Sequence, residues 1–288
     1  MDFFTFARLH GILLQSYPPI GVWKRYPTED HPHKRNGAVK FMGTHAFVQN
    51  HAMQTEISVW HNEAEVKIDM RKILEEQRQA EARRRKLQVE AANKAAFILK
   101  QSVNAKHPYL KSKGFDEEYG NVWTKDKVDY LVVPMRVDGS LVGCQTITPE
   151  GEKKFLFGQR TAGAAFTFDN KGPHILCEGY ATALSVRAAL KAMKRRYTLH
   201  VCFSAGNMIK VAETLSQGYV VADNDESKTG ENTAKKIGWP YWMPPDTNCD
   251  FNDYHVKFGL FKASQALCSG MSRRVNEDMR GLQAGKAR

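Results

Sequence analysis

The sequence predicts an α/β protein built around a parallel β-sheet. Three short apolar runs, 174–177, 198–203 and 218–222, alternate with segments whose apolar spacing and alanine content are typical of helices. Strands that alternate with crossover helices in this way form parallel sheets on which the helices pack. Such sheets bind their ligands in the crevice at the carboxyl ends of the strands. We therefore expect the chemistry of this chain directly after these runs.

Acidic residues follow two of the three runs. Glu178 comes after the first run, and Asp223 and Asp225 come after the third. Aspartates at positions i and i+2 of an extended segment point to one side, so both are expected to face Glu178. Three converging carboxylates repel one another unless a cation binds, and oxygen ligands favour Mg²⁺ or Mn²⁺ over zinc. A phosphate ester or polyphosphate is the natural substrate of such a site.

Four segments follow one another in the part of the chain that holds these carboxylates: Glu178-Gly179-Tyr180-Ala181-Thr182-Ala183, Ser204-Ala205-Gly206-Asn207, Ala222-Asp223-Asn224-Asp225 and Asp250-Phe251-Asn252-Asp253. Together they resemble the Toprim domain of phage- and plasmid-encoded DNA primases. Several linked motifs are more specific than a lone Glu-Gly or Asp-x-Asp. The resemblance implies a Toprim domain over 171–268, that is, a Rossmann-like parallel sheet with helices on both faces.

The same resemblance implies a DNA primase, a nucleotidyltransferase that makes short primers on single-stranded DNA during phage or plasmid replication. It implies that Glu178, Asp223 and Asp225 are catalytic, and that they hold Mg²⁺ or Mn²⁺ together with Asp250 and Asp253. A 3′-hydroxyl would attack an α-phosphate and pyrophosphate would leave. Glu178 would be either a metal ligand or the group that manages the proton. The expected partners are single-stranded DNA template, nucleoside triphosphates and a separate replicative helicase.

Each carboxylate also has a plain structural interpretation. Glu178 would stabilise the following helix through its charge near the N-terminus, and Asp223 and Asp225 would be residues that favour turns. Asp250 would be a helix N-cap with Asp253 in the first turn. Two other functions also remain open. A Toprim nuclease would hydrolyse DNA with the same carboxylates, and a catalytically inactive chain would serve replication as a single-stranded-DNA-binding accessory protein.

Residues 1–62 are predicted to form a small β-rich module, in which Asn36-Gly37 is typical of a hairpin turn. Primases of this family commonly carry a zinc-binding module at this position. The segment has no cysteine, and its histidines follow no ligand spacing, so we interpret them as surface and turn residues. Trp23, Lys34 and Arg35 are expected to bind single-stranded DNA through base stacking and phosphate contacts. The histidines are His10, His31, His33, His45, His51 and His61.

Residues 63–105 are nearly free of Gly and Pro and are predicted to form a helical spacer. The basic run 83–86 lies at helical spacing from Glu81 and Glu90, which favours a solvated helix face over a DNA contact. Residues 269–288 are small and basic and are predicted to form a flexible tail.

Residues 106–170 are predicted to form a β-rich basic subdomain, with strand-like runs at 130–136, 141–147 and 153–157 separated by turns. This segment resembles the subdomain that precedes Toprim in the same primases and faces the metal site across a cleft. The resemblance implies phosphate contacts for Arg136, Lys153, Lys154 and Arg160. Lys228, which follows the Asp-x-Asp, is expected to approach the incoming triphosphate.

Composition agrees with a polyanionic partner. The 288 residues include 42 Lys and Arg against 31 Asp and Glu, a net charge of +11. No apolar run approaches the length that spans a bilayer, so no membrane partner is expected. The five scattered cysteines are predicted to be reduced thiols, which indicates the cytoplasm, and the host-cell cytoplasm if a phage encodes the chain.

Overall fold

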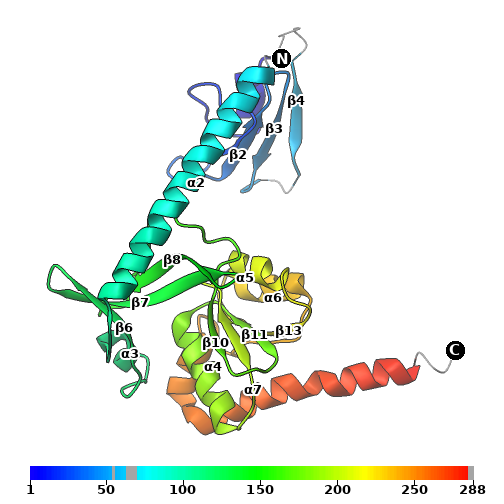
Figure 1. The fold of residues 1–288 in the computed structure, drawn as a ribbon. Coiled ribbons are helices and arrows are strands. Elements are labelled where there is room, and N and C mark those ends of the chain that lie inside the picture. The colour runs from blue at the N-terminus through cyan, green and yellow to red at the C-terminus, as the bar shows by residue number, and fades with distance from the viewer. Residues whose placement is uncertain (54–55, 63–69, 285–288) are drawn as a thin grey trace. The chain divides into compact units, whose positions relative to one another are not determined.

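The computed structural model describes residues 1–53, 56–62 and 70–284, and for 70–74, 76–77 and 272–284 it describes the backbone alone. Within this part of the chain the fold is mixed α/β, with seven helices and three sheets (Figure 1). The chain divides into two compact units, Met1–Arg85 and Lys86–Arg288. None of the described helices is long and apolar enough to cross a membrane.

The first unit contains a four-stranded antiparallel sheet, one short helix and, at its end, residues 70–85 of a long helix. Phe3 of the short helix is buried against Val39, Val48 and Trp60 of the sheet, and these side chains form the core of the unit. The segment predicted to be β-rich therefore has a core of its own. Its elements are α1 (Phe3–Leu9), β1 (Trp23–Tyr26), β2 (Gly37–Phe41), β3 (His45–Asn50) and β4 (Ser58–His61), with the strands in sequence order across the sheet.

Asn36-Gly37 does not form the predicted hairpin turn. Gly37 is the first residue of β2 and pairs with Tyr26, so residues 27–36 connect the two strands. A Cβ atom at Gly37 would come within 3.0 to 3.2 Å of side-chain atoms of Ile12. The glycine is therefore explained by the close packing of Ile12 against β2 rather than by a turn.

α2 (Met70–Gln101) fills most of the predicted helical segment 63–105, of which 63–69 lie outside the described residues. The exposed side chains of Arg85 and Glu81 form an ion pair of 2.9 Å at i,i+4 spacing. This pair confirms Glu81 as the predicted acidic partner of the basic run.

An antiparallel sheet follows in the second unit and occupies the segment predicted to be β-rich and basic, 106–170. The end of α2 packs on it, because Ala95 and Ile98 are buried against Val132 and Cys144. A short helix, α3 (Pro108–Ser112), lies between its first two strands in the chain. In order across the sheet the strands are β5 (Val103–Ala105), β6 (Gly120–Lys125), β7 (Val128–Val137), β8 (Ser140–Ile147) and β9 (Lys153–Phe155).

The second sheet of this unit has the predicted parallel arrangement. Its order is β10-β12-β11-β13-β14, in which β10 runs antiparallel to β12 and the other pairs are parallel. The strands are β10 (Phe166–Asp169), β11 (His174–Cys177), β12 (Thr198–Val201), β13 (Gly218–Val221) and β14 (Tyr241–Trp242). The helices are α4 (Tyr180–Ala192), α5 (Ala205–Ala212), α6 (Thr229–Ile237) and α7 (Phe251–Ala284).

Helices cover both faces of this sheet because each central strand alternates its side chains between two cores. Ile175 and Cys177 pack into one core with residues of α4 and α7, whereas Leu176 packs into the other with residues of α5 and α6. Successive side chains of a strand point to opposite faces, so a strand buried on both faces has a continuous apolar sequence. Each fully buried aliphatic side chain contributes about 1.5–3 kcal/mol to stability.

α7 extends further than the sequence predicts. Gly259, with φ 81° and ψ 163°, divides it into two helical parts. The expected helix ends near Leu267 and a flexible tail follows at 269–288, whereas the backbone is helical as far as Ala284. Residues 285–288 lie outside the described residues. The flexibility of this segment stays a prediction.

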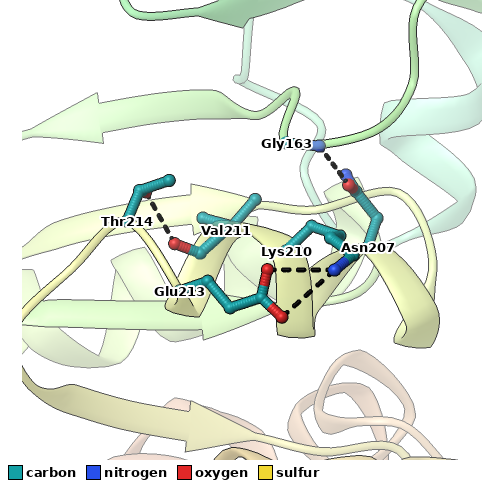
Figure 2. Close-up of polar contacts among 6 residues, drawn as sticks. All are labelled: Gly163, Asn207, Lys210, Val211, Glu213 and Thr214. Carbon is teal, nitrogen blue, oxygen red and sulfur yellow. Dashed lines mark hydrogen bonds and ion pairs between the residues drawn. The ribbon is translucent and has the colours of Figure 1, made fainter.

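Asn207 anchors the loop between β9 and β10 on the parallel sheet. Its side-chain oxygen accepts a hydrogen bond from the Gly163 N–H at 2.7 Å, and Figure 2 shows this contact. Its amide nitrogen donates to the carbonyl oxygens of Ala164, at 2.8 Å, and Cys202, at 2.7 Å. One buried side chain therefore joins the loop before β10 to the end of β12.

Asn207→Ala should lower the free energy of unfolding by about 2–4 kcal/mol, because it leaves buried backbone groups without hydrogen-bond partners. Lys210→Ala is the matched control on the same helix. Lys210 forms an exposed pair with Glu213 at 3.0 Å (Figure 2), so its loss should cost less than about 0.5 kcal/mol. Urea denaturation followed by circular dichroism measures both values. Equal losses would contradict the role of Asn207.

Candidate active site

The register of the parallel sheet brings Glu178 and Asp223 to one edge. β11 and β13 are neighbours, and Cys177 lies opposite Val221 at their carboxyl ends. Glu178 follows Cys177 directly, and Asp223 follows Val221 after one residue. Two carboxylates that are 45 residues apart in the sequence (223 minus 178) therefore start from adjacent strand ends, as the sequence predicts.

Asp223 is a largely buried acid whose charged form is disfavoured. Its Oδ1 atom is buried and has no hydrogen-bond partner among the described residues. Burial, and then the negative charges of Asp250 and Glu178, raise the pKa of Asp223 to about 8, while the charge of Lys153 opposes the rise. Near neutral pH this carboxyl is mostly protonated unless a cation compensates its charge.

Glu178 is partly buried at the same site. Burial, and then the negative charge of Asp225, raise the pKa of Glu178. Lys153 and a hydrogen bond from the backbone of Ala205 act in the opposite direction. Since Glu178 also raises the pKa of Asp223, the acids from β11 and β13 lie within electrostatic reach of one another. Glu178 therefore does not point into an apolar interior.

Asp225 is engaged by the start of α6. Its carboxylate accepts hydrogen bonds from the Ser227 hydroxyl and from the backbone N–H groups of Thr229 and Gly230, both at 3.0 Å. These bonds, that of Ser227 first, hold the pKa of Asp225 below its usual value. The expectation that Asp223 and Asp225 face one point is met only in part. Asp225 keeps a fixed negative charge beside Glu178, but it also caps a helix.

Asp250 and Asp253 form a reciprocal pair at the start of α7. The Asp250 N–H donates to the Asp253 carboxylate at 3.1 Å, and the Asp253 N–H donates to the Asp250 carboxylate at 2.9 Å. This is a capping box, so the helix-capping interpretation holds for both residues. Asp250 also acts on the site, because its charge raises the pKa of Asp223. Asp253 is not among the main causes of the raised pKa of Glu178 or Asp223.

Of the predicted phosphate-binding residues, Lys153 is the one brought to the carboxylates. Its positive charge lowers the pKa of both Glu178 and Asp223. Lys154 follows it on β9 and pairs with Glu152 at 3.0 Å on the exposed surface. Adjacent residues of a strand point to opposite sides, which explains why the two lysines differ.

The remaining predicted contacts lie on the surface of the two units. Arg136 donates to the carbonyl of Gly139, and Arg160 donates to that of Ala162, so each guanidinium bends back to its own loop. Lys228 is exposed at the start of α6. Trp23, Lys34 and Arg35 are exposed on the first unit, where the ring centroids of Trp23 and Phe47 are 6.4 Å apart.

The donor chemistry of the site suits a divalent cation, but its side chains do not surround one point. In the part of the chain that the structure describes, no three His, Cys, Asp or Glu side chains form a metal-binding group, and this includes the histidines of the first unit. The unpartnered Oδ1 of Asp223 and its repulsion by Glu178 and Asp250 are nevertheless the features that a bound cation would relieve. Oxygen donors of this kind match Mg²⁺ or Mn²⁺.

The sequence does not reveal the contacts of Asn207 or the backbone conformation of Phe203. Asn207 belongs to the predicted Ser-Ala-Gly-Asn segment, but its three-way contact joins segments that are distant along the chain. Phe203 precedes that segment and adopts a left-handed backbone with φ 67°. The sequence places Phe203 at the end of the apolar run 198–203, whereas the strand ends at Val201 and Phe203 follows it.

Comparison of the chain with protein-family models, with curated proteins and with solved structures found no match. Inference about function therefore depends on the residues of the site and on the motifs that they occupy.

Proposed function

We propose that the second unit is a DNA primase of the phage and plasmid type, which joins nucleotides on a single-stranded DNA template by metal-assisted nucleotidyl transfer. One observation carries the proposal: at the carboxyl edge of a parallel sheet, the charge of Lys153 lowers the pKa of both Glu178 and Asp223, whereas the charges of Asp225 and Asp250 raise pKa values in the same pair. An acidic site opposed by a cation on a separate sheet suits a substrate with both phosphates and a bound metal.

The order of the strands and motifs supports a Toprim assignment for this sheet. Glu178 follows β11, the Asp-x-Asp follows the adjacent β13, and Asp250 follows β14 in the chain. The antiparallel sheet that precedes it carries Lys153, as expected for the basic subdomain of such primases. The two sheets share one core, in which Leu131 and Val133 pack with Ile175.

Glu178, Asp223 and Asp250 are the residues that would hold Mg²⁺ or Mn²⁺, and Asp225 would add its charge from the cap of α6. When bound, the metal would polarise the α-phosphate and offset the charge that develops there. Asp250 is kept because its charge raises the pKa of Asp223, and Asp253 is left out because it is not among the main charges that act on Glu178 or Asp223.

In the proposed reaction the 3′-oxygen of the primer forms a bond to the α-phosphorus, and the bond from that phosphorus to the bridging oxygen breaks to release pyrophosphate. The proton of the 3′-hydroxyl must be accepted. Glu178 has two alternative roles: it either holds the metal or accepts this proton, and a raised pKa in the absence of metal suits the second role. Lys153 would bind the anionic phosphates, with a charge-assisted interaction that Lys154 does not provide.

Lys153→Ala should lower kcat/KM for nucleotide incorporation by about 10–100-fold, because it removes a positive charge from the phosphate site. Lys154→Ala is the matched control on the same strand and should change it by less than about 3-fold. The loss of Lys153 also removes an effect that lowers the pKa of Glu178. The acidic limb of the pH–rate profile should therefore move to higher pH in Lys153→Ala alone. Equal effects of the two substitutions would contradict the assignment.

The direct test is a primer-synthesis assay with labelled ribonucleotides, deoxyribonucleotides and single-stranded DNA, with Mg²⁺ or Mn²⁺. Template-dependent products of defined length support the proposal. Cleavage of labelled DNA with Mn²⁺ and no nucleotides would indicate a nuclease instead. Binding of single-stranded DNA without either reaction would indicate an accessory protein.

A further inference from the structure

Phe203 has an unusual backbone conformation next to Glu178. Its φ of 67° lies in the left-handed region, which bulky side chains rarely adopt. The other non-glycine residues with positive φ in the described chain are Asp, Asn or Lys, so Phe203 is the one aromatic residue among them. Strained residues of this kind cluster at functional sites.

Two backbone hydrogen bonds hold Phe203 in this place. The N–H of Cys202 donates to the carbonyl of Cys177, and the N–H of Phe203 donates to the carbonyl of Glu178, both at 2.8 Å. The pairing of β11 with β12 thus continues past the ends of the strands. The backbone of Phe203 is therefore hydrogen-bonded directly to the backbone of Glu178.

The Phe203 ring meets Phe155 of β9. The ring centroids are 6.2 Å apart and the rings are tilted by 80°, which is an edge-to-face contact. Phe155 lies two residues after Lys153 and therefore on the same side of the strand. The strand that presents Lys153 to the carboxylates thus presents Phe155 to Phe203 at the border of the same site.

Core packing accounts for Phe203 in part, because this residue packs against the core that the two sheets share. It does not account for Phe155, a large apolar residue that is 45% exposed. The open area of Phe155 instead offers an aromatic surface beside the proposed phosphate site.

We infer that Phe155 and Phe203 form a stacking platform for the base of a nucleoside triphosphate whose phosphates are bound by Lys153. This inference builds on the proposed function, because it assigns the base subsite of the same site. Stacking on an aromatic ring is tolerant of sequence, since every base has a π-face. The platform therefore suits a site that must accept different nucleotides in turn.

Isothermal titration with ATP and with inorganic tripolyphosphate, in Mg²⁺, separates the base from the phosphates. Phe155→Ala should weaken ATP binding on the order of 10-fold and leave tripolyphosphate binding unchanged. Phe155→Tyr keeps the ring and should bind ATP like the wild type. Phe261→Ala, which removes an 81% exposed ring on α7, is the control and should have no effect. Lys153→Ala should weaken both ligands.

Three outcomes would overturn the inference: unchanged ATP affinity in Phe155→Ala, equal weakening of ATP and tripolyphosphate, or a selective loss of affinity for oligothymidylate. The last result would assign the platform to the DNA strand. Failure of the proposed function gives a different pattern, in which no primer is made while Phe155→Ala still loses ATP affinity selectively. Phe203→Leu, which keeps an apolar side chain at the strained position, should repeat the result of Phe155→Ala.

Discussion

Asp223→Asn should reduce template-dependent primer synthesis by at least about 100-fold while binding of single-stranded DNA changes little. The amide removes the carboxylate whose pKa is raised by the charges of Asp250 and Glu178 and whose Oδ1 has no hydrogen-bond partner among the described residues. DNA affinity should persist because phosphate contacts come from lysine and arginine side chains. Gel-based extension with labelled nucleotides measures synthesis, and fluorescence anisotropy measures DNA binding.

Glu226→Gln is the matched control for this experiment. Glu226 lies three residues after Asp223, is exposed, and accepts a hydrogen bond from the Asn248 side chain at 2.9 Å. Its substitution should leave synthesis within about 2-fold of the wild type. If Asp223→Asn lost DNA binding and synthesis to the same extent, the carboxylate would have a structural role and the proposed reaction would be wrong.

The second large effect concerns the dependence of stability on pH. Folding raises the pKa of Asp223 to about 8 from an unfolded value near 4, so the folded chain retains a proton that the unfolded chain releases. The neutral Asp223 carboxyl makes its full contribution to the free energy of unfolding below about pH 4. This contribution is lost as the pH rises through about 8. In metal-free buffer, Asp223→Asn should therefore be more stable than the wild type at pH 9, by on the order of 3 kcal/mol.

Urea denaturation between pH 5 and pH 9, with EDTA or with Mg²⁺, measures this dependence. The fall in unfolding free energy with rising pH should be smaller in Asp223→Asn than in the wild type or in Glu226→Gln. Mg²⁺ should stabilise the wild type at pH 8 and have little effect on Asp223→Asn, because a ligand that binds only the folded state stabilises it. Equal pH slopes in all three proteins would show that the Asp223 carboxyl is not perturbed.

The sequence predicts the positions of Glu178 and Asp223 well, because both depend on local signals. A short apolar run marks the end of a parallel strand, and parallel strands place their carboxyl ends at one edge. The alternation of apolar runs with helix-like segments likewise predicts the order of strands and helices along the chain. The sequence alone therefore predicts the edge of the sheet at which the site lies.

Tertiary contacts decide what the sequence does not predict. Asp225 caps α6 because that helix begins close to it, and nothing in Asp-x-Asp specifies the partner. Lys153 and Lys154 look equivalent in the sequence. Because neighbouring residues of β9 point to opposite sides, only the charge of Lys153 acts on Glu178, whereas Lys154 pairs with Glu152. Gly37 fits a turn by its local sequence, but it serves the packing of Ile12, which lies 25 residues earlier (37 minus 12).

We propose that the carboxylates at the sheet edge bind a divalent cation, and Mn²⁺ titration calorimetry tests this proposal most directly. Because Asp223 is mostly protonated at pH 7, Mn²⁺ binding should release a proton, and the measured heat should vary with the ionisation enthalpy of the buffer. The wild type and Glu226→Gln should show this dependence, and Asp223→Asn should bind Mn²⁺ at least about 10-fold more weakly and release no proton. Equal Mn²⁺ affinity in the wild type and Asp223→Asn, or no binding to the wild type, would contradict the claim.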